Sequence, residues 1–230
     1  MIEVHEGRRA GAATCVLVAL FTMLASTLAF AGAQVEEALS ASVQASLHRA
    51  VSDFPAPKLI FASNAEGEAW LQEMSKRLES RMPDWPTRRD FLITVQYEAS
   101  RAGLDPQMVL GLIQHESNFR KFAVSVADAR GYMQVMPFWV RQIGTPDQNL
   151  FNLRTNLRYG CTILRYYLDR EGGDYFRALG RYNGSLGRPE YPTAVVTNTK
   201  QNWSWSYRVP LEPAKQTLDP AKQAMAPAPH

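Results

Sequence analysis

The sequence predicts a mainly α-helical fold with one compact domain. Several segments place apolar residues at helical spacing behind a capping residue, and no segment shows the alternation of apolar and polar residues that is typical of a strand. The chain has 230 residues, of which 46% are hydrophobic and 20% charged. This composition can bury one sizeable core after leader and tail segments are subtracted.

Residues 1–33 have the layout of a secretory signal peptide. Arg8 and Arg9 precede an uncharged apolar run over residues 10–30, and small residues follow it. We therefore expect the mature chain to begin near Gly32 or Gln34. Because the apolar run is also about long enough to span a bilayer, an uncleaved membrane anchor is the alternative.

Cysteine content and charge exclude several classes of protein. Cys15 lies within the signal peptide, so Cys161 is alone in the mature chain and is expected to be a buried thiol without a disulfide partner. A single cysteine with scattered histidines argues against a metal site. The net charge is only +3, and no basic run is interleaved with aromatic residues, which argues against nucleic acid as a partner.

Residues 34–84 are expected to form an N-terminal helical extension outside the main domain. The composition of residues 35–47 favours a helix, which the prolines in residues 53–57 interrupt. Ser63 and Glu66 match a capping box. The helix predicted after them has an apolar residue at every fourth position until Pro83, namely Trp70, Met74, Leu78 and Met82.

Residues 85–207 are expected to form the main domain. Thr87 is predicted to open its first helix and Gly103 to cap that helix at the C-terminus. Asp105 and Pro106 then supply an N-cap and a first-turn proline for a helix that runs toward Asn118. A later helix ends at Gly172-Gly173 and has one apolar side, formed by Leu157, Cys161, Leu164 and Leu168. Residues 208–230 lack a periodic apolar face and are predicted to be a disordered tail.

Glu116 is the candidate for acid chemistry. Val109, Leu112 and Ile113 precede it by seven, four and three positions, so its carboxyl falls on the apolar side of the predicted helix. Burial there would raise the carboxyl pKa, as a proton donor near neutral pH requires. The alternative is a glutamate that reaches solvent at the end of a helix.

Glu116 also belongs to a set of ordered motifs. They are His115-Glu116-Ser117-Asn118-Phe119, Ala123-Val124-Ser125, Gly131-Tyr132-Met133-Gln134-Val135-Met136-Pro137 and Ala178-Leu179-Gly180-Arg181-Tyr182-Asn183-Gly184-Ser185. Together they resemble the soluble lytic transglycosylase (SLT) domain, a lysozyme-like family related to goose-type lysozyme. The resemblance covers about residues 88–205 and implies a lysozyme-like helical domain with a substrate cleft.

The resemblance implies a role for each matching residue. Glu116 corresponds to the catalytic acid and base, with Ser117 supporting the end of its helix. Five residues correspond to substrate-binding positions, namely Ser125, Met133, Gln134, Tyr182 and Asn183. Core packing is the alternative for Met133, and a buried core tyrosine is the alternative for Tyr182.

Two residues depart from the family's pattern. Asp128 stands where glycine is usual, and we expect a turn with left-handed backbone there, since aspartate tolerates it better than most residues. A second carboxylate beside Glu116 is the alternative. Tyr132 stands where leucine is usual, as either an aromatic platform in the groove or a packed replacement for that leucine.

The function implied by the resemblance is that of a peptidoglycan lytic transglycosylase. Such an enzyme cleaves the β-1,4 bond between N-acetylmuramic acid and N-acetylglucosamine without water and leaves a 1,6-anhydromuramyl end, with no metal or organic cofactor. A goose-lysozyme-like hydrolase and a non-catalytic peptidoglycan-binding scaffold are the alternatives. We expect a periplasmic monomer that acts on glycan strands, with an inner-membrane anchor as the alternative location. An envelope-spanning secretion or conjugation apparatus stays open as a partner.

Overall fold

The structure is a computed structural model that describes residues 34–52 and 55–207. The described residues form helices and no strand, with only two isolated bridges, so the predicted mainly α-helical class is confirmed. The signal peptide predicted for residues 1–33 and the tail predicted for residues 208–230 lie outside the described residues. The helices are α1 (Ala41–Ser52), α2 (Asn64–Leu78), α3 (Trp85–Arg101), α4 (Pro106–Ser117), α5 (Phe138–Ile143), α6 (Leu153–Arg170), α7 (Tyr175–Asn183), α8 (Glu190–Asn198) and the π-helix η1 (Thr199–Trp203).

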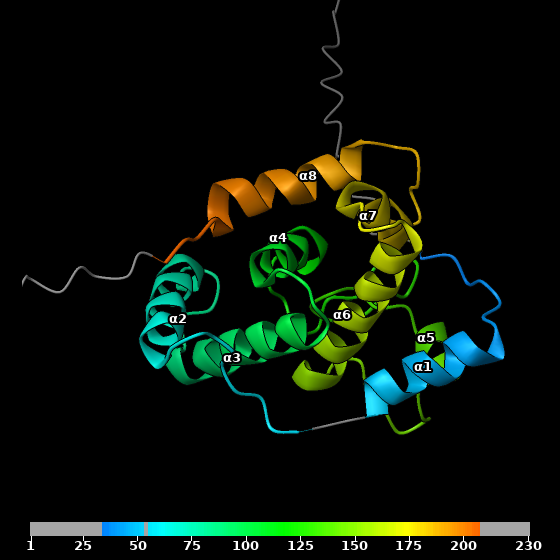
Figure 1. Cartoon of the computed structure of the whole chain (residues 1–230), viewed down its shortest axis with the longest axis horizontal. Helices are drawn as coiled ribbons and strands as arrows, with labels where there is room; N and C mark the ends of the chain where they lie inside the picture. The colour runs from blue at the N-terminus through cyan, green and yellow to red at the C-terminus, as the bar shows by residue number, and fades with distance from the viewer. Residues whose placement is uncertain (1–33, 53–54, 208–230) are drawn as a thin grey trace, which may run out of the picture.

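Helix α4 lies at the centre of the fold, with the other helices arranged around it (Figure 1). It packs against α3 and against the continuous arm formed by α8 and η1. The close approach of that arm requires a glycine, because a Cβ on Gly111 would lie 2.0 Å from Oγ1 of Thr199 and 2.9 Å from its backbone nitrogen. Helix α4 is therefore packed between α3 on one side and the arm of α8 and η1 on the other (Figure 1).

Capping residues define the helix starts near the centre of the fold. The Ser63 hydroxyl accepts a hydrogen bond from the Glu66 amide at 3.1 Å, and the Asp105 carboxylate accepts one from the Gln107 amide at 2.8 Å, as predicted. The prediction that Thr87 opens the next helix is wrong. The carboxylate of Asp84 caps it by accepting from the Thr87 amide at 2.9 Å, so α3 starts at Trp85.

The first helix also begins later than predicted. Residues 35–40 are not helical, and α1 starts behind Ser40, whose hydroxyl accepts from the Val43 amide at 3.4 Å. The side chain of Gln34 anchors the preceding segment, because its Oε1 accepts from Nε1 of Trp139 at 2.9 Å and from the Met136 amide at 3.3 Å. The segment 34–40 is therefore held by residues about a hundred positions away in the chain.

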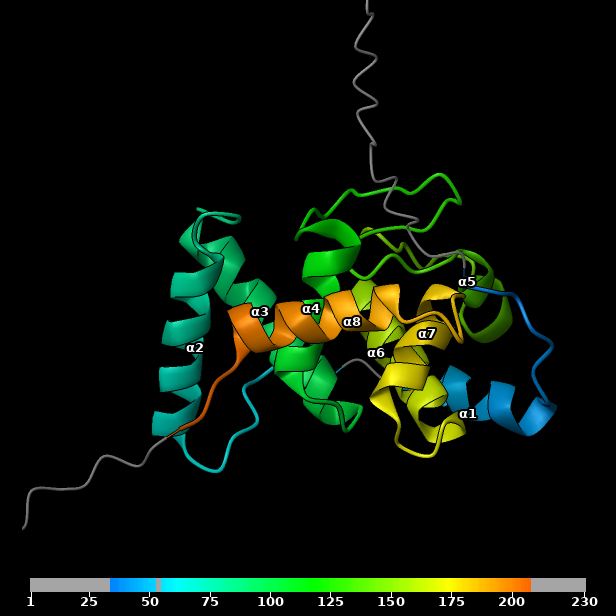
Figure 2. The same ribbon diagram turned by 90° about the horizontal axis from the view of Figure 1, so that it is seen from above.

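Helices α1 and α2 lie at opposite ends of the molecule (Figures 1 and 2). Helix α1 packs against α5 and α6, and α2 packs against α3 and η1. Their buried residues, among them Val51 and Trp70, belong to the same hydrophobic core as α4. The residues expected to form an extension thus share the core of the main domain, and the boundary after residue 84 stays a prediction.

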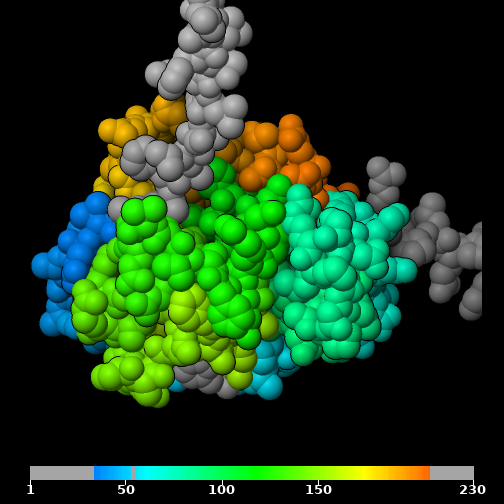
Figure 3. All heavy atoms as spheres, turned by 180° about the vertical axis from the view of Figure 1, so that it is seen from behind, coloured from blue at the N-terminus to red at the C-terminus, as the bar shows by residue number. Residues whose placement is uncertain are grey.

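The connection between α4 and α5 spreads over one face of the molecule. It is green in Figure 3 and lies beside the teal surface of α2. Its backbone turns back on itself, since Arg130 forms bridges with both Val124 and Val135. This connection contains most of the residues that the sequence motifs single out.

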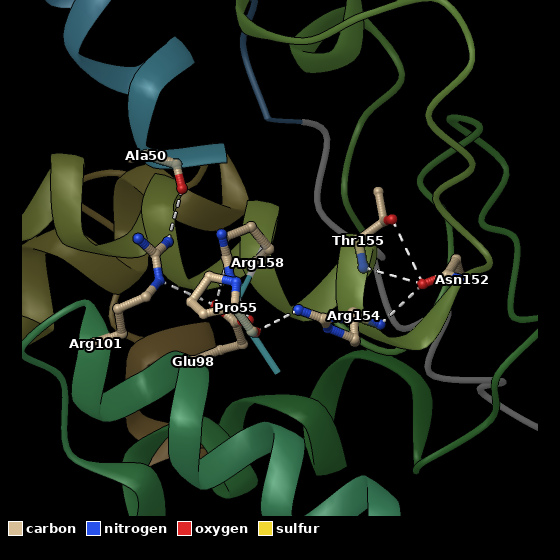
Figure 4. A network of polar contacts seen from close by, with 8 residues as sticks. All are labelled: Ala50, Pro55, Glu98, Arg101, Asn152, Arg154, Thr155 and Arg158. Atoms are coloured by element: carbon tan, nitrogen blue, oxygen red, sulfur yellow. Dashed lines mark hydrogen bonds and ion pairs between the residues drawn. The ribbon is translucent and has the colours of Figure 1, made fainter. Parts of the chain in front are cut away.

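A buried ion pair joins α3 to α6 (Figure 4). The guanidinium of Arg158 donates to both carboxylate oxygens of Glu98, at 2.5 and 2.8 Å, and both side chains are fully buried. Arg101 also donates to Glu98, at 3.2 Å, and reaches the Ala50 carbonyl at 2.8 Å, so the network extends to α1. The nearby thiol of Cys161 is fully buried, as expected.

Candidate active site

Glu116 lies in the last turn of α4. The residues three, four and seven positions before it are fully buried, so the predicted apolar face exists. Asn118 and Phe119 then end the helix with left-handed backbone, at φ angles of 47° and 64°. The hydroxyl of Ser117 donates to the Tyr132 carbonyl at 2.7 Å, which ties this helix end to the α4–α5 connection. The position of Glu116 is therefore fixed by the buried face of α4 before it and by the Ser117 hydrogen bond after it.

The carboxyl of Glu116 is desolvated and touches one phenol. Burial raises its pKa from 4.5 to about 8, and the hydrogen bond that the Tyr191 hydroxyl donates to Oε1 partly opposes this shift. Tyr191 is itself buried in the first turn of α8. The carboxyl is consequently protonated at neutral pH, as a general acid must be.

His115 contributes no positive charge beside this carboxyl at neutral pH. Its ring packs edge-on against Tyr191, with the ring centroids 4.9 Å apart. Partial burial lowers its pKa below 6.5, so the imidazole is neutral at pH 7. The raised pKa of the carboxyl is thus not opposed by a neighbouring imidazolium.

Tyr182 occupies a different place from Tyr191. Its hydroxyl donates to the Met133 carbonyl at 2.7 Å, and the ring is 1% exposed. Burial raises its pKa well above 10, and the nearby charge of Glu116 adds to that shift. Tyr182 therefore lies within electrostatic reach of Glu116, while the hydrogen bond to the carboxylate comes from Tyr191.

Met133 and Gln134 point into the fold. Met133 is fully buried against α6, where a Cβ on Gly160 would lie 2.3 Å from its sulfur. The side-chain amide of Gln134 donates to the carbonyls of Ala123 and Gly131, at 3.1 and 2.9 Å, and the residue is 3% exposed. Both residues organise the α4–α5 connection, and their contact with substrate stays a prediction.

Ser125 and Asn183 differ in how their side chains are used. The Ser125 hydroxyl accepts from the Ala129 amide at 3.0 Å and so closes the turn over residues 125–129. Asn183 ends α7 and is 8% exposed, and among the described residues its Nδ2 has no hydrogen-bond partner. A buried amide donor without a partner is uncommon in a folded protein. The Oγ of Ser185 nearby is also buried without a partner in the described part of the chain.

Comparison with known families identifies the domain that contains Glu116. Residues 93–202, from α3 to η1, match the Transglycosylase SLT domain. Residues 93–202 of the chain are a domain of this family. The SLT domain is a lysozyme-like helical fold, and the match includes Glu116, Tyr182 and Tyr191. The family predicted from the ordered motifs is thus confirmed.

Known relatives of the chain are transglycosylases. A protein described as transglycosylase in Enterobacteria phage PRD1 is 31% identical over 112 residues, which are 46% of this chain and 41% of the phage protein. The membrane-bound lytic murein transglycosylase C of Histophilus somni strain 2336 is 34% identical over 113 residues, 42% of this chain and 31% of that protein. The protein of the same description in Actinobacillus pleuropneumoniae serotype 5b is 45% identical over 115 residues, 43% of this chain and 32% of that protein. The chain spans less than half the length of these relatives, and no solved structure matches it.

The two departures from the SLT pattern have structural explanations. Asp128 has a φ of 68°, the left-handed backbone expected there, and its carboxylate is bound by Arg130 at 2.9 and 3.0 Å. Tyr132 is 4% exposed and packs on Phe91, with the ring centroids 4.9 Å apart. It therefore fills the place of a packed leucine.

Sequence reasoning did not find the tyrosine that binds the catalytic candidate of this SLT domain. Tyr191 is 75 positions from Glu116, and the motif that contains Tyr182 ends before it. Pro189 and Pro192 mark a helix start around it, but no local pattern connects that helix to Glu116. Only the packing of α8 on α4 brings the two side chains together.

The described residues contain neither a metal-binding group of side chains nor a membrane-spanning helix. No three His, Cys, Asp or Glu side chains among them are grouped closely enough to hold a metal ion. No helix within residues 34–52 or 55–207 has the length and apolar character needed to cross a membrane.

Proposed function

We propose that this protein is a peptidoglycan lytic transglycosylase with Glu116 as its catalytic acid and base. The observation that carries the proposal is the desolvated carboxyl of Glu116, with a pKa of about 8, in hydrogen-bond contact with Tyr191 inside an SLT domain. An acid with this pKa holds its proton at neutral pH and becomes an effective base once the proton has left.

The reaction needs one carboxyl in two roles. Glu116 donates its proton to the glycosidic oxygen while the bond between that oxygen and C1 of N-acetylmuramic acid breaks. The acetamido group of the same sugar stabilises the positive carbon, as in substrate-assisted glycosidases. The ionised Glu116 then accepts the proton of the C6 hydroxyl as its oxygen bonds to C1. The product carries a 1,6-anhydro ring, the acid is restored and no water is consumed.

The neighbours of Glu116 support this cycle. The Tyr191 hydroxyl donates to the carboxylate and so stabilises it after the first proton transfer. The unpartnered Nδ2 of Asn183 suits a donor that meets a sugar oxygen, because substrate would then supply the missing acceptor. The bidentate ion pair with Arg130 makes Asp128 a poor candidate for a second catalytic base.

Location and partners form part of the proposal. We place the mature chain in the periplasm after removal of residues 1–33, with an inner-membrane anchor as the alternative. Glycan strands are the proposed substrate, and a monomer is the proposed acting species. A secretion or conjugation apparatus that spans the envelope is the partner class we would test.

Replacement of Glu116 by glutamine tests the proposal. Glu116→Gln keeps the shape of the side chain but has no acidic proton, so release of soluble fragments from purified sacculi should fall below a tenth of the wild-type rate while binding to sacculi persists. Glu68→Gln, at an exposed position of α2, is the matched control and should cleave normally. A well-folded Glu116→Gln protein that cleaves at more than a tenth of the wild-type rate would move the catalytic acid to another residue.

A further inference from the structure

A polar hollow lies between the end of α2 and the π-helix η1. Its volume is about 470 Å³, and its lining contains two arginines and no carboxylate. The lining residues are Arg77, Arg81, Gln201, Asn202, Trp203 and Ser204. Such a lining favours an anionic ligand.

Arg77 lines this hollow and is held in place by hydrogen bonds. Its Nε donates to Glu73 at 2.7 Å, and its Nη1 donates to the backbone carbonyls of Asn202 and Ser204, at 3.2 and 2.8 Å. The charge of Arg77 is therefore already balanced by a carboxylate, and its main role is to hold η1 against α2. The cation available to a ligand has to be Arg81.

Arg81 is exposed but held in place. Its Nε donates to Oδ1 of Asn118 at 3.0 Å, and its guanidinium lies 6.0 Å from the ring centroid of Phe119. In the described part of the chain it has no carboxylate within ion-pair distance, whereas Arg88 and Arg130 each have one. A guanidinium that is held in place and has no acidic partner can donate its remaining N–H groups to a carboxylate in a bidentate hydrogen bond.

The hollow adjoins the catalytic helix. Asn118 comes two residues after Glu116, so Arg81 binds the end of the helix that carries the proposed acid. Figure 2 shows the C-terminal ends of α2 and α4 on the same side of the molecule, and Figure 3 shows that side directly. The hollow and the proposed acid therefore lie at the same end of α4.

We propose that Arg81 and the hollow bind a carboxylate of the peptide carried by N-acetylmuramic acid. The inference rests on the proposed function. The lactyl group of this sugar is joined by an amide bond to a peptide that carries free carboxylates, whereas a strand stripped by an amidase keeps only the lactyl carboxylate itself. Arg81 would therefore make the enzyme prefer peptide-bearing glycan to bare glycan.

The test compares two substrates with two variants. Uncrosslinked glycan strands with their peptides, and the same strands after an amidase has removed the peptides, are digested and the release of soluble fragments is followed. Arg81→Gln should lower kcat/KM on peptide-bearing strands by about tenfold and change it by less than about twofold on bare strands, because one charge-assisted contact is lost. Arg81→Lys keeps a positive charge but cannot make the bidentate contact of a guanidinium. Its kcat/KM on peptide-bearing strands should therefore lie between those of wild type and Arg81→Gln.

Arg49→Gln is the matched control, since Arg49 is an exposed arginine on α1 at the opposite end of the molecule. It should leave both rates unchanged. Equal losses on the two substrates would overturn the inference, because they would mean that Arg81 supports the end of α4 or binds the lactyl carboxylate, and does not bind the peptide. An unchanged preference in Arg81→Lys and Arg81→Gln would overturn it as well. If wild type cleaves neither substrate, the proposed function itself fails, which is a separate result.

Discussion

The protonation of Glu116 follows from its surroundings and not from its place in the sequence alone. The carboxyl sits on the buried face of α4, where burial raises its pKa to about 8. A residue whose pKa is raised in the folded state favours folding below its unfolded pKa, near 4.5, and loses that contribution as the pH rises through the folded value. Ionisation of Glu116 thus destabilises the folded state, and the hydrogen bond from Tyr191 reduces this cost.

The pH profile of the reaction should report this carboxyl. Cleavage needs the protonated acid, so kcat/KM should fall as the pH rises through about 8. Tyr191→Phe removes a hydrogen bond that lowers the pKa, so this descending limb should move to higher pH. The same change should lower kcat by about tenfold or more, because the carboxylate formed in the reaction loses a donor.

Tyr166→Phe on α6 is the control for loss of a phenol hydroxyl, and its pH profile should match that of wild type. A Tyr191→Phe protein whose descending limb stays in place would mean that a group other than Glu116 controls the profile.

At the scale of helices, local signals predicted two of the starts correctly, those of α2 and α4, but not the contacts between helices. Ser63 and Asp105 cap their helices as predicted because a cap is a bond to an amide two or three residues away. Thr87 failed as a start because Asp84, a stronger candidate by the same rule, stands three residues earlier. No such rule joins Glu98 to Arg158, which are 60 positions apart and meet only when α3 packs on α6.

The buried ion pair should matter more for stability than any surface pair. Glu98→Gln leaves Arg158 in the core without its carboxylate, and we expect a loss of about 3–5 kcal/mol in the free energy of unfolding measured with urea. Asp169→Asn removes the partner of Arg165 in an exposed pair and should cost less than about 1 kcal/mol. Similar losses in the two variants would mean that the buried pair does not hold α3 and α6 together.

At the scale of the whole molecule, the segment before α1 reaches across to the α4–α5 connection. Gln34 accepts from the buried Nε1 of Trp139 and donates to the Gln134 carbonyl at 3.5 Å. The sequence could not predict this contact, because residues 34–40 have no apolar pattern and their partners are about a hundred positions away. The motif residues were found because the family fixes their order, whereas Gln34 lies outside the matched residues 93–202.

Loss of the Gln34 contacts should destabilise the fold at the α4–α5 connection. Gln34→Ala leaves the indole N–H of Trp139 buried without an acceptor, which should cost about 1–3 kcal/mol in the free energy of unfolding. Glu36→Ala removes an exposed ion pair with Arg141 and an exposed hydrogen bond from Gln142, and serves as the control. Equal thermal midpoints for Gln34→Ala and the control would show that the segment contributes nothing to the fold.

The central claim is that the bond is cleaved without water. The most direct measurement is digestion of purified sacculi by the wild-type protein in water enriched in oxygen-18, followed by mass spectrometry of the released fragments. The account predicts 1,6-anhydromuramyl ends that contain no oxygen-18, because the C6 hydroxyl attacks C1 and Glu116 takes its proton. Reducing muramic acid ends that carry one oxygen-18 atom as the main product would contradict the account and identify the protein as a hydrolase.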